Sequence, residues 1–332
     1  MPDPLLEVSD LRVTFRTRGG TVAAVDGLSF TVDDGEVLGI VGESGSGKSV
    51  SMLSILKLIR DPNAEISGSV RFRGRDLLAL GDRELREVRG RDIAMIFQDP
   101  MTALTPVYRV GWHIAEQIQA HERVTKRAAR DRAVRLLAEV GIPDPARRVD
   151  SFPHEFSGGM RQRVVIAMAL ACNPALLIAD EPTTALDVTT QAQVLDLMRR
   201  LRATHGSAIM IITHDMGVVS EIADRVLVMY GGRAVERGPK GEVFRRPRHP
   251  YTWGLLDSVP RVTGPKVRRL PTIPGAPGGP HDVPAGCGFA PRCRLRHPAC
   301  DARPELRGAG SHLDACWLPA DGRSALREET HG

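Results

Sequence analysis

The sequence predicts an α/β protein with a largely parallel sheet, and three observations lead to this class. A short apolar run, Val37–Val41, is typical of a strand buried on both faces, and it leads directly into a glycine-rich loop. We expect a helix after this loop, from Lys48 to about Leu58. Further on, buried strands are expected at 175–179 and 208–212, with a helix between them at 190–205. Such alternation of strands and helices favours an α/β core.

The flanking segments add strands at the start of the chain and helices in its middle. Residues 6–15 alternate apolar and polar, as strand faces do, and 22–32 indicates a second strand. From 113 to 140 the pattern is helical and charged, with an apolar stripe that includes Ile114 and Ile118. Another helix is expected after Ser157, running through Met168.

Length, charge and hydropathy limit the class of protein. At 332 residues the chain can bury one large core plus an appendage. The longest apolar run, Val164–Cys172, is far shorter than the roughly 20 residues that a membrane-spanning helix needs. The first residues show no pattern of a secretory signal. We therefore expect a cytoplasmic protein whose membrane role, if it has one, is peripheral.

The glycine-rich loop carries the clearest chemistry. It satisfies the pattern G-x-x-x-x-G-K-[ST], and the glycines let backbone N–H groups converge on phosphate oxygens beside a helix N-terminus. Lys48 should reach the β- and γ-phosphates of ATP, and the Ser49 hydroxyl should bind Mg²⁺. The residues expected to contact the nucleotide here are Gly42, Glu43, Ser44, Gly45, Ser46, Gly47, Lys48 and Ser49.

Two acids end the expected strand before Pro182. Asp180 is positioned to hold the Mg²⁺ shell, and Glu181 is positioned to polarise the attacking water. Acids at a strand end can also be no more than a polar loop, but the intact phosphate loop favours the catalytic interpretation.

The segment FSGGMRQR, Phe156–Arg163, resembles the signature sequence of the ABC ATPase family. Ser157, Gly158 and Gly159 match this signature, while Phe156 and Met160 replace the commoner Leu and Gln. The resemblance implies that these three residues begin a helix whose N-terminus faces the γ-phosphate of ATP held by a partner subunit.

The rest of the family pattern follows in order. The resemblance implies that Gln98 contacts Mg²⁺ and water and reports the nucleotide state to membrane subunits. It implies that the loop Ala185–Asp187 crosses a dimer interface, with Asp187 near the nucleotide, and that His214 contacts the γ-phosphate.

Two further segments resemble the ATPases of dipeptide and oligopeptide importers: Gln98–Ile118, which engages membrane partners in that subfamily, and Arg248–Pro260. The resemblance implies an ATP-hydrolysing subunit on the cytoplasmic face of the membrane that drives peptide uptake. Its implied partners are two transmembrane permease subunits, a second ABC ATPase, which we expect to be a paralogue, and an extracytoplasmic solute-binding protein. Nickel or another small solute remains an alternative cargo.

Four of the five cysteines gather near the end of the chain. Cys287, Cys293, Cys300 and Cys316 lack the two-residue spacing usual in zinc ribbons. Four thiolates suit iron–sulfur or zinc chemistry, and free or redox-active thiols are a third alternative. The amino-acid sequence around these cysteines resembles the C-terminal region of peptide-importer ATPases, and this resemblance implies a 4Fe-4S cluster in preference to zinc. Such a centre would order a tail rich in Pro, Gly and Arg.

The full expectation is a phosphate-loop NTPase of ABC type with a helical subdomain and a small irregular C-terminal metal-binding extension. The nucleotide-binding domain should span 1–245, with the helical subdomain at about 99–156, and the extension should span 246–332. A soluble ABC ATPase acting in DNA repair or translation is the competing class, but the chain has one cassette and no long coiled-coil insertion. A nucleic-acid partner is not expected, because the tail has few aromatic residues for stacking.

Overall fold

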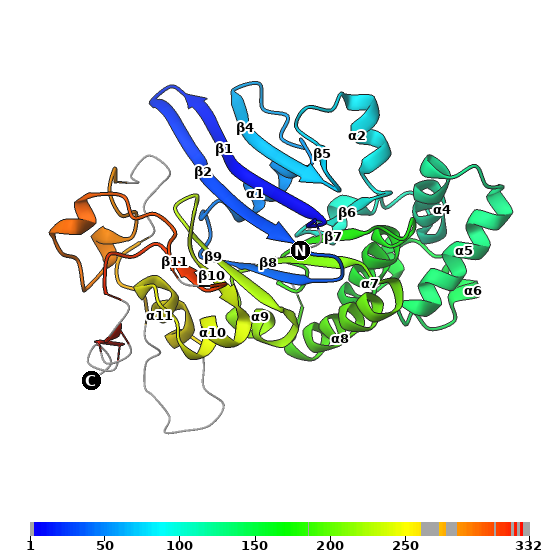
Figure 1. The fold of residues 1–332 in the computed structure, drawn as a ribbon. Coiled ribbons are helices and arrows are strands. Elements are labelled where there is room, and N and C mark those ends of the chain that lie inside the picture. The colour runs from blue at the N-terminus through cyan, green and yellow to red at the C-terminus, as the bar shows by residue number, and fades with distance from the viewer. Residues whose placement is uncertain are drawn as a thin grey trace. The chain divides into compact units, whose positions relative to one another are not determined.

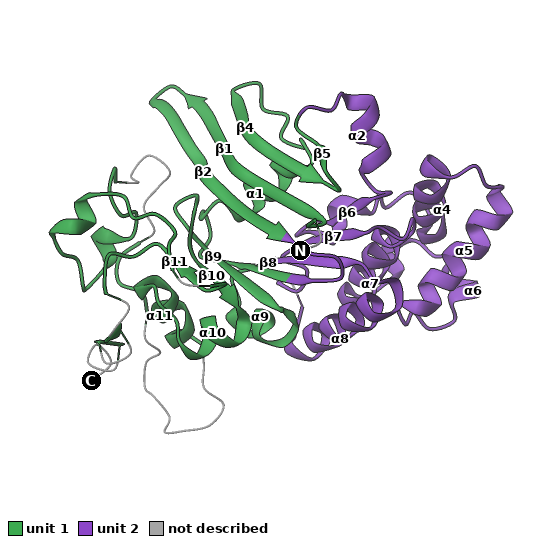
Figure 2. Cartoon of the chain, in the orientation of Figure 1, with its two compact units in different colours: residues 1–31, 38–78, 213–332 green, residues 32–37, 79–212 purple. Residues whose placement is uncertain are grey.

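The computed structural model describes residues 3–184, 186–259, 272–276, 284–308, 310–319, 322–323 and 326–327. The chain divides into two compact units (Figure 2). Unit 1 comprises residues 1–31, 38–78 and 213–332, and unit 2 comprises residues 32–37 and 79–212. The domain boundaries expected from the sequence stay a prediction.

Unit 1 contains a four-stranded sheet with the strand order β2-β1-β4-β5 (Figure 1). Its strands are β1 (Leu6–Thr17), β2 (Gly20–Val32), β4 (Ala64–Phe72) and β5 (Arg75–Asp76). β1 pairs antiparallel with β4, and the register shifts between Ser9 and Arg12. Asp10, at this bulge, has a φ of 47°, and the buried side chains change there from Leu6 and Val8 to Leu11 and Val13. One extra residue therefore moves the apolar face from even to odd positions.

The second group of strands in unit 1 is built around β9 (Arg225–Tyr230). β3 (Val37–Val41) runs parallel to β9, β10 (Arg233–Pro239) pairs antiparallel with β9, and β11 (Leu313–Asp314) adds to β10. All five residues of β3 are buried, as its apolar run predicts. The helices of unit 1 are α1 (Lys48–Ile55), α9 (Met216–Ile222), α10 (Lys240–Arg245) and α11 (Pro250–Asp257).

Unit 2 contains the parallel strands β6 (Ile93–Ile96), β7 (Leu176–Asp180) and β8 (Ala208–Thr213), with β7 in the middle. β7 and β8 confirm the strands expected at these positions to within a residue, whereas β6 was not expected. The strand β7 is buried along its whole length, so a near-continuous apolar run is what its position between two strands requires.

The remaining elements of unit 2 are helical: α2 (Asp82–Val88), α3 (Pro100–Ala103), α4 (Val110–His121), α5 (Lys126–Glu139), α6 (Pro145–Arg148), the 3₁₀ turn η1 (Pro153–Glu155), α7 (Gly158–Ala169) and α8 (Val188–His205). The helical pattern expected from 113 to 140 thus forms two helices. The second begins where the Thr125 hydroxyl accepts a hydrogen bond from the Ala128 N–H, as an N-cap does.

A buried acid connects the C-terminal extension to the strands of unit 1. Glu236, on β10, has no exposed surface. Its carboxylate accepts hydrogen bonds from the backbone N–H groups of Arg248 (2.8 Å) and His249 (2.9 Å) and lies 2.7 Å from Nε2 of His312. Since a buried charge is tolerated only when its hydrogen bonds are made, this one carboxylate fixes the start of α11 and the approach to β11.

The extension also has an aromatic cluster, although its composition suggested little core. The rings of Tyr230, Tyr251 and Phe289 meet in pairs with centroids 4.7 to 5.4 Å apart. Phe289 precedes the short 3₁₀ turn η2 (Ala290–Arg292), and a second turn, η3 (Pro298–Asp301), follows. Buried rings and hydrogen-bonded charges therefore help to order the described part of the tail, a task that the sequence analysis gave to a metal centre.

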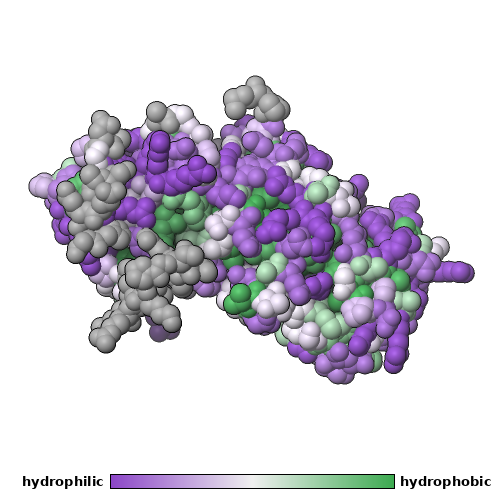
Figure 3. All heavy atoms as spheres, turned by 90° about the horizontal axis from the view of Figure 1, so that it is seen from below, coloured by the Kyte–Doolittle hydropathy of each residue, from purple (hydrophilic) through white to green (hydrophobic). Residues whose placement is uncertain are grey.

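The surface seen in Figure 3 is mostly hydrophilic, and its hydrophobic residues form separate small patches. Across the described residues, no helix combines the length and apolar character needed to cross a bilayer.

The buried side chain of His249, at the start of α11, predicts that the stability of the protein depends on pH. His249 is fully buried, and this burial lowers its pKa to about 4, while its Nδ1 accepts a hydrogen bond from the Tyr251 N–H. An unfolded chain takes up this proton near pH 6.5. The free energy of unfolding should therefore fall as the pH drops from 6.5 to 4, by about 3 kcal/mol from this group.

His249→Asn keeps a side-chain oxygen that can cap α11 but removes the titrating group. We expect the midpoint of thermal unfolding to depend less on pH between 6.5 and 4 in this variant. The matched control is His154→Asn, which changes an exposed histidine. Equal pH dependence in His249→Asn and the parent chain would contradict the assignment.

Candidate functional site

The phosphate loop lies between β3 and α1 in unit 1, and its glycines are required by close backbone contacts. A Cβ placed on Gly42 would lie 2.2 Å from the carbonyl oxygen of Met229. Gly47 has a φ of +93°, and a Cβ there would lie 2.5 Å from the carbonyl oxygen of Ala24. No side chain fits at either position, so the loop can take this path only with glycine.

Lys48 is buried at the first position of α1 and turns back over the loop. Its Nζ donates hydrogen bonds to the carbonyl oxygens of Gly42 (2.7 Å) and Glu43 (2.9 Å). The loop is closed by further backbone hydrogen bonds, from Ser46 N–H to the Glu43 carbonyl and from Gly232 N–H to the Ser46 carbonyl. The ammonium group is thus held at the centre of the loop, where a phosphate-binding lysine belongs.

Two residues that the sequence did not single out contact this loop from the extension. The Tyr251 hydroxyl accepts a hydrogen bond from the Glu43 N–H at 2.7 Å. Arg292 makes two hydrogen bonds to the Glu43 carboxylate, at 2.6 and 3.0 Å. Both residues lie in segments that carry the resemblance to peptide-importer ATPases. The sequence of these segments does not show that either residue contacts Glu43.

In unit 2 the acids at the end of β7 take different positions. Asp180 is buried. Glu181 has a φ of 47°, in the left-handed region that residues other than glycine seldom adopt, and its N–H donates to the Ile212 carbonyl. Backbone conformations of this kind cost about 1–3 kcal/mol and concentrate at functional sites.

The Glu181 carboxylate is held by two neighbours. Nε2 of Gln98 donates to it at 3.0 Å, and the Thr184 hydroxyl donates at 2.9 Å. The structure therefore brings together two predicted site residues, Gln98 and Glu181, which are separated by 83 positions in the sequence. Thr184 is a further contact that the sequence analysis missed, although it lies in the loop directly after the strand.

The signature residues begin α7. The Ser157 side chain accepts a hydrogen bond from the Met160 N–H at 3.4 Å, as an N-cap does. A Cβ on Gly159 would lie 2.5 Å from Cγ2 of Thr190, so packing against α8 requires glycine there. Gly158 is different: it is exposed, and no described atom lies within 4 Å of the position of a Cβ.

The loop before α8 is only partly described, because Ala185 lies outside the described residues. Asp187 caps α8, with its carboxylate accepting from the N–H of Thr190 (3.0 Å) and from the Thr190 hydroxyl (2.7 Å). These hydrogen bonds lower the pKa of Asp187. The residue is therefore ionised at neutral pH and fixed at a helix N-terminus.

His214 directly follows β8 and is exposed. It belongs to unit 1 with the phosphate loop, whereas Gln98, Asp180, Glu181 and the signature residues belong to unit 2. The roles given to all these residues stay predictions, each with a defined local geometry.

The four C-terminal cysteines are free thiols that lie near one another. The Cys287 N–H donates to the Cys300 carbonyl at 2.9 Å. Burial, with smaller effects of neighbouring groups, raises the pKa of Cys287 and Cys293 and raises that of Cys316 to about 11. Within the described residues, which include all four cysteines, no group of three or more His, Cys, Asp or Glu side chains is placed to hold a metal ion. The structure does not support the predicted metal centre.

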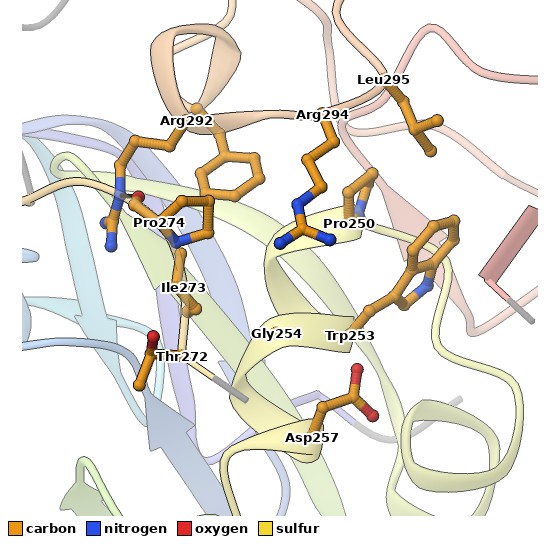
Figure 4. A pocket seen from close by; sticks show the side chains of 11 residues that line it. Pro250, Trp253, Gly254, Asp257, Thr272, Ile273, Pro274, Arg292, Arg294 and Leu295 are labelled. Atoms are coloured by element: carbon orange, nitrogen blue, oxygen red, sulfur yellow. Dashed lines mark hydrogen bonds between the residues drawn. The ribbon is translucent and has the colours of Figure 1, made fainter. Parts of the chain in front are cut away.

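A cavity of about 240 Å³ lies in the extension beside α11 (Figure 4). Trp253 and Asp257 border it from α11, Ile273 and Pro274 from the segment 272–276, and Arg292 from η2. Figure 4 shows the guanidinium groups of Arg292 and Arg294 lying apart. None of the residues 42–49 is among the described residues that line this cavity, although Arg292 borders the cavity and contacts Glu43.

Two family models and many relatives match this chain. The family described as ABC transporter matches residues 25–184, and the family described as oligopeptide/dipeptide transporter, C-terminal region, matches residues 235–300. The chain is 56% identical to the oligopeptide transport ATP-binding protein OppD of Bacillus subtilis (strain 168), over 95% of this chain and 88% of that protein. It is 52% identical to a peptide import ATP-binding protein of Brucella melitensis biotype 1, over 93% and 95%.

Among solved structures, the fold resembles a dimeric ATP-binding cassette in a post-hydrolysis state bound to ADP and Pi. The TM-score is 0.63 at 26% identity, over 71% of this chain and 98% of that one.

The glycines of the loop give a matched pair of variants. Gly47→Ala introduces both a strained φ and a backbone clash, whereas Gly45→Ala, at a φ of +78°, meets no described atom within 4 Å. The φ strain alone costs about 1–2 kcal/mol. We expect Gly47→Ala to lower the midpoint of thermal unfolding further than Gly45→Ala and to weaken ATP binding at least about tenfold more. Equal losses in both variants would mean that the contact with Ala24 does not shape the loop.

Proposed function

Because the chain belongs to the ATP-binding subunits of ABC importers of the oligopeptide and dipeptide type, we propose how its residues bind and hydrolyse ATP. The proposal rests mainly on the hydrogen bond from Gln98 to Glu181. This bond joins two residues that the sequence analysis expected to act in ATP hydrolysis, and it lies at the end of β7. The similarity to peptide-import proteins favours transport over the alternative role in DNA repair or translation.

The phosphate loop binds the phosphates of ATP. Its N–H groups and the N-terminus of α1 provide partial positive charge, and Lys48 adds a full charge directed at the β- and γ-phosphates. Lys48 exchanges its present hydrogen bonds to Gly42 and Glu43 for phosphate oxygens. Ser49, Gln98 and Asp180 are the residues that would hold Mg²⁺, whose chemistry is to offset the charge of the phosphates.

Glu181 activates the water that attacks the γ-phosphate. A carboxylate oriented by two donors is prepared for this task, because Gln98 and Thr184 fix its direction without protonating it. His214, at the end of β8, contacts the γ-phosphate as the family pattern implies.

A second ATPase subunit completes the site. Ser157 and Gly158 are exposed at the N-terminus of α7, and the lack of a side chain at Gly158 serves no described contact within the chain. A bare helix N-terminus suits the approach of another subunit's ATP, as the resemblance of the signature implies. Asp187 lies in the loop expected to cross the same interface.

We also propose that the subunit acts at the cytoplasmic face of the membrane with two permease subunits and an extracytoplasmic solute-binding protein. Large apolar side chains are exposed in and beside the segment 98–118, which the resemblance to peptide-importer ATPases assigns to membrane partners; these are Phe97, Met101, Val107, Tyr108 and Trp112. Exposed apolar side chains that lie together commonly mark a partner contact, and the rings of Tyr108 and Trp112 stack with their centroids 4.0 Å apart. Peptides are the proposed cargo, and nickel or another small solute is the alternative.

A 4Fe-4S cluster on Cys287, Cys293, Cys300 and Cys316 remains a proposal that rests on the four cysteines and on the family resemblance of the sequence around them, with zinc second. Iron, sulfide and zinc should be measured after purification without oxygen, and stoichiometric iron and sulfide are expected. Stoichiometric zinc without iron, or no metal at all, would refute the cluster.

Glu181→Gln tests the hydrolytic mechanism. The amide keeps the shape of the side chain but loses the basic oxygen, so we expect ATP binding to persist and phosphate release to fall by about 10²-fold or more. The matched control is Glu87→Gln, which changes an exposed glutamate on α2. Near-normal hydrolysis by Glu181→Gln would refute the role given to Glu181.

A further inference from the structure

The phosphate loop contains an acid where an anion must bind. Glu43 follows Gly42 directly, so it places a carboxyl group in a loop that is expected to bind the phosphates of ATP, and like charges repel. Arg292 forms a bidentate ion pair with this carboxylate, with Nη1 2.6 Å from Oε2 and Nη2 3.0 Å from Oε1. The Arg292 side chain is 5% exposed and the Glu43 side chain 25%, so solvent screens this pair less than it screens a pair on the open surface.

We propose that Arg292 is a positioning residue of the ATP site, which acts from the C-terminal extension by neutralising Glu43 and fixing the direction of its side chain. Tyr251 completes the arrangement by accepting the hydrogen bond of the Glu43 N–H. The extension thereby sets the affinity of the loop for nucleotide. This inference rests on the proposed binding of ATP by residues 42–49.

The guanidinium of Arg292 is held by several groups. Besides Glu43, it donates through Nε to the Pro274 carbonyl (2.9 Å) and through Nη2 to the Gly275 carbonyl (3.2 Å). It also lies over the rings of Tyr230 and Phe289, at 5.8 and 6.0 Å from their centroids. A guanidinium held in this way keeps its fork aligned with a carboxylate, which a flexible ammonium group would not do.

The backbone that carries Arg292 belongs to the cysteine segment. η2 is bounded by hydrogen bonds from the Ala290 N–H to the Cys287 carbonyl and from the Cys293 N–H to the Ala290 carbonyl. The conformation of this segment therefore decides where the guanidinium lies. Tyr251 reaches the loop independently, from α11.

The test compares the affinity of full-length variants for MgATP by equilibrium titration, with thermal unfolding measured in parallel. Arg292→Met keeps much of the side-chain length but leaves Glu43 without its counter-charge, so we expect the Kd to rise about tenfold or more. Arg292→Lys, which keeps the charge without the fork, should show a smaller rise. The matched control is Arg294→Met, an exposed arginine two positions along the same segment.

A double variant separates positioning from a general loss of structure. If the harm in Arg292→Met comes from the uncompensated carboxylate, adding Glu43→Gln should recover part of the lost affinity. A purely structural role for Arg292 predicts no recovery. If Arg292→Met does not fold, the same comparison is made with Arg292→Gln, which retains hydrogen-bond donors.

The outcomes distinguish this inference from the proposed function. An unchanged Kd in Arg292→Met, or no recovery in the double variant, overturns the role of Arg292. Lys48→Ala serves as the reference for the loop itself: if it binds MgATP as tightly as the parent chain, the ATP site is wrongly placed. If Lys48→Ala loses binding and Arg292→Met does not, only the positioning role fails.

Discussion

The close contact between the backbone of the phosphate loop and the backbone around it is the constraint on which the site depends. The carbonyl oxygens of Met229 and Ala24 occupy the space that side chains at Gly42 and Gly47 would need. Hydrogen bonds from Gly232 to Ser46 and from Glu43 to Tyr251 hold the same loop from two further directions. Because the N–H groups of a loop bind phosphate only when they converge, the fold must fix this path before any nucleotide arrives.

Buried charged side chains are a second constraint on the structure, because their hydrogen bonds connect the extension to the rest of unit 1. Glu236, Arg292 and Asp314 are all buried, and each is hydrogen-bonded: Glu236 to the start of α11, Arg292 to Glu43, and Asp314 to Arg323 at 2.7 Å. Removing one partner of a buried ion pair typically costs about 3–5 kcal/mol, since the other charge is left behind. Such pairs therefore specify one arrangement of a tail that has few apolar residues.

Local patterns predicted much of the fold. β3, β7 and β8 were expected because strands buried on both faces need continuous apolar runs. The shift of the buried face at Asp10 and the break between α4 and α5 were not expected, since a bulge and a helix cap depend on hydrogen bonds that hydropathy does not show. The strand β6 was missed because four residues give too short a pattern.

The sequence by itself predicted the chemistry of the phosphate loop, of the acids at the end of β7 and of the signature at the start of α7, because each depends on residues within a single turn and on their spacing. The tertiary structure decided which distant side chains act on them. Gln98 reaches Glu181 across 83 positions, and Arg292 reaches Glu43 across 249. No local pattern encodes such pairs, since an ion pair between remote residues exists only when the packed strands and turns bring both charges to the same place.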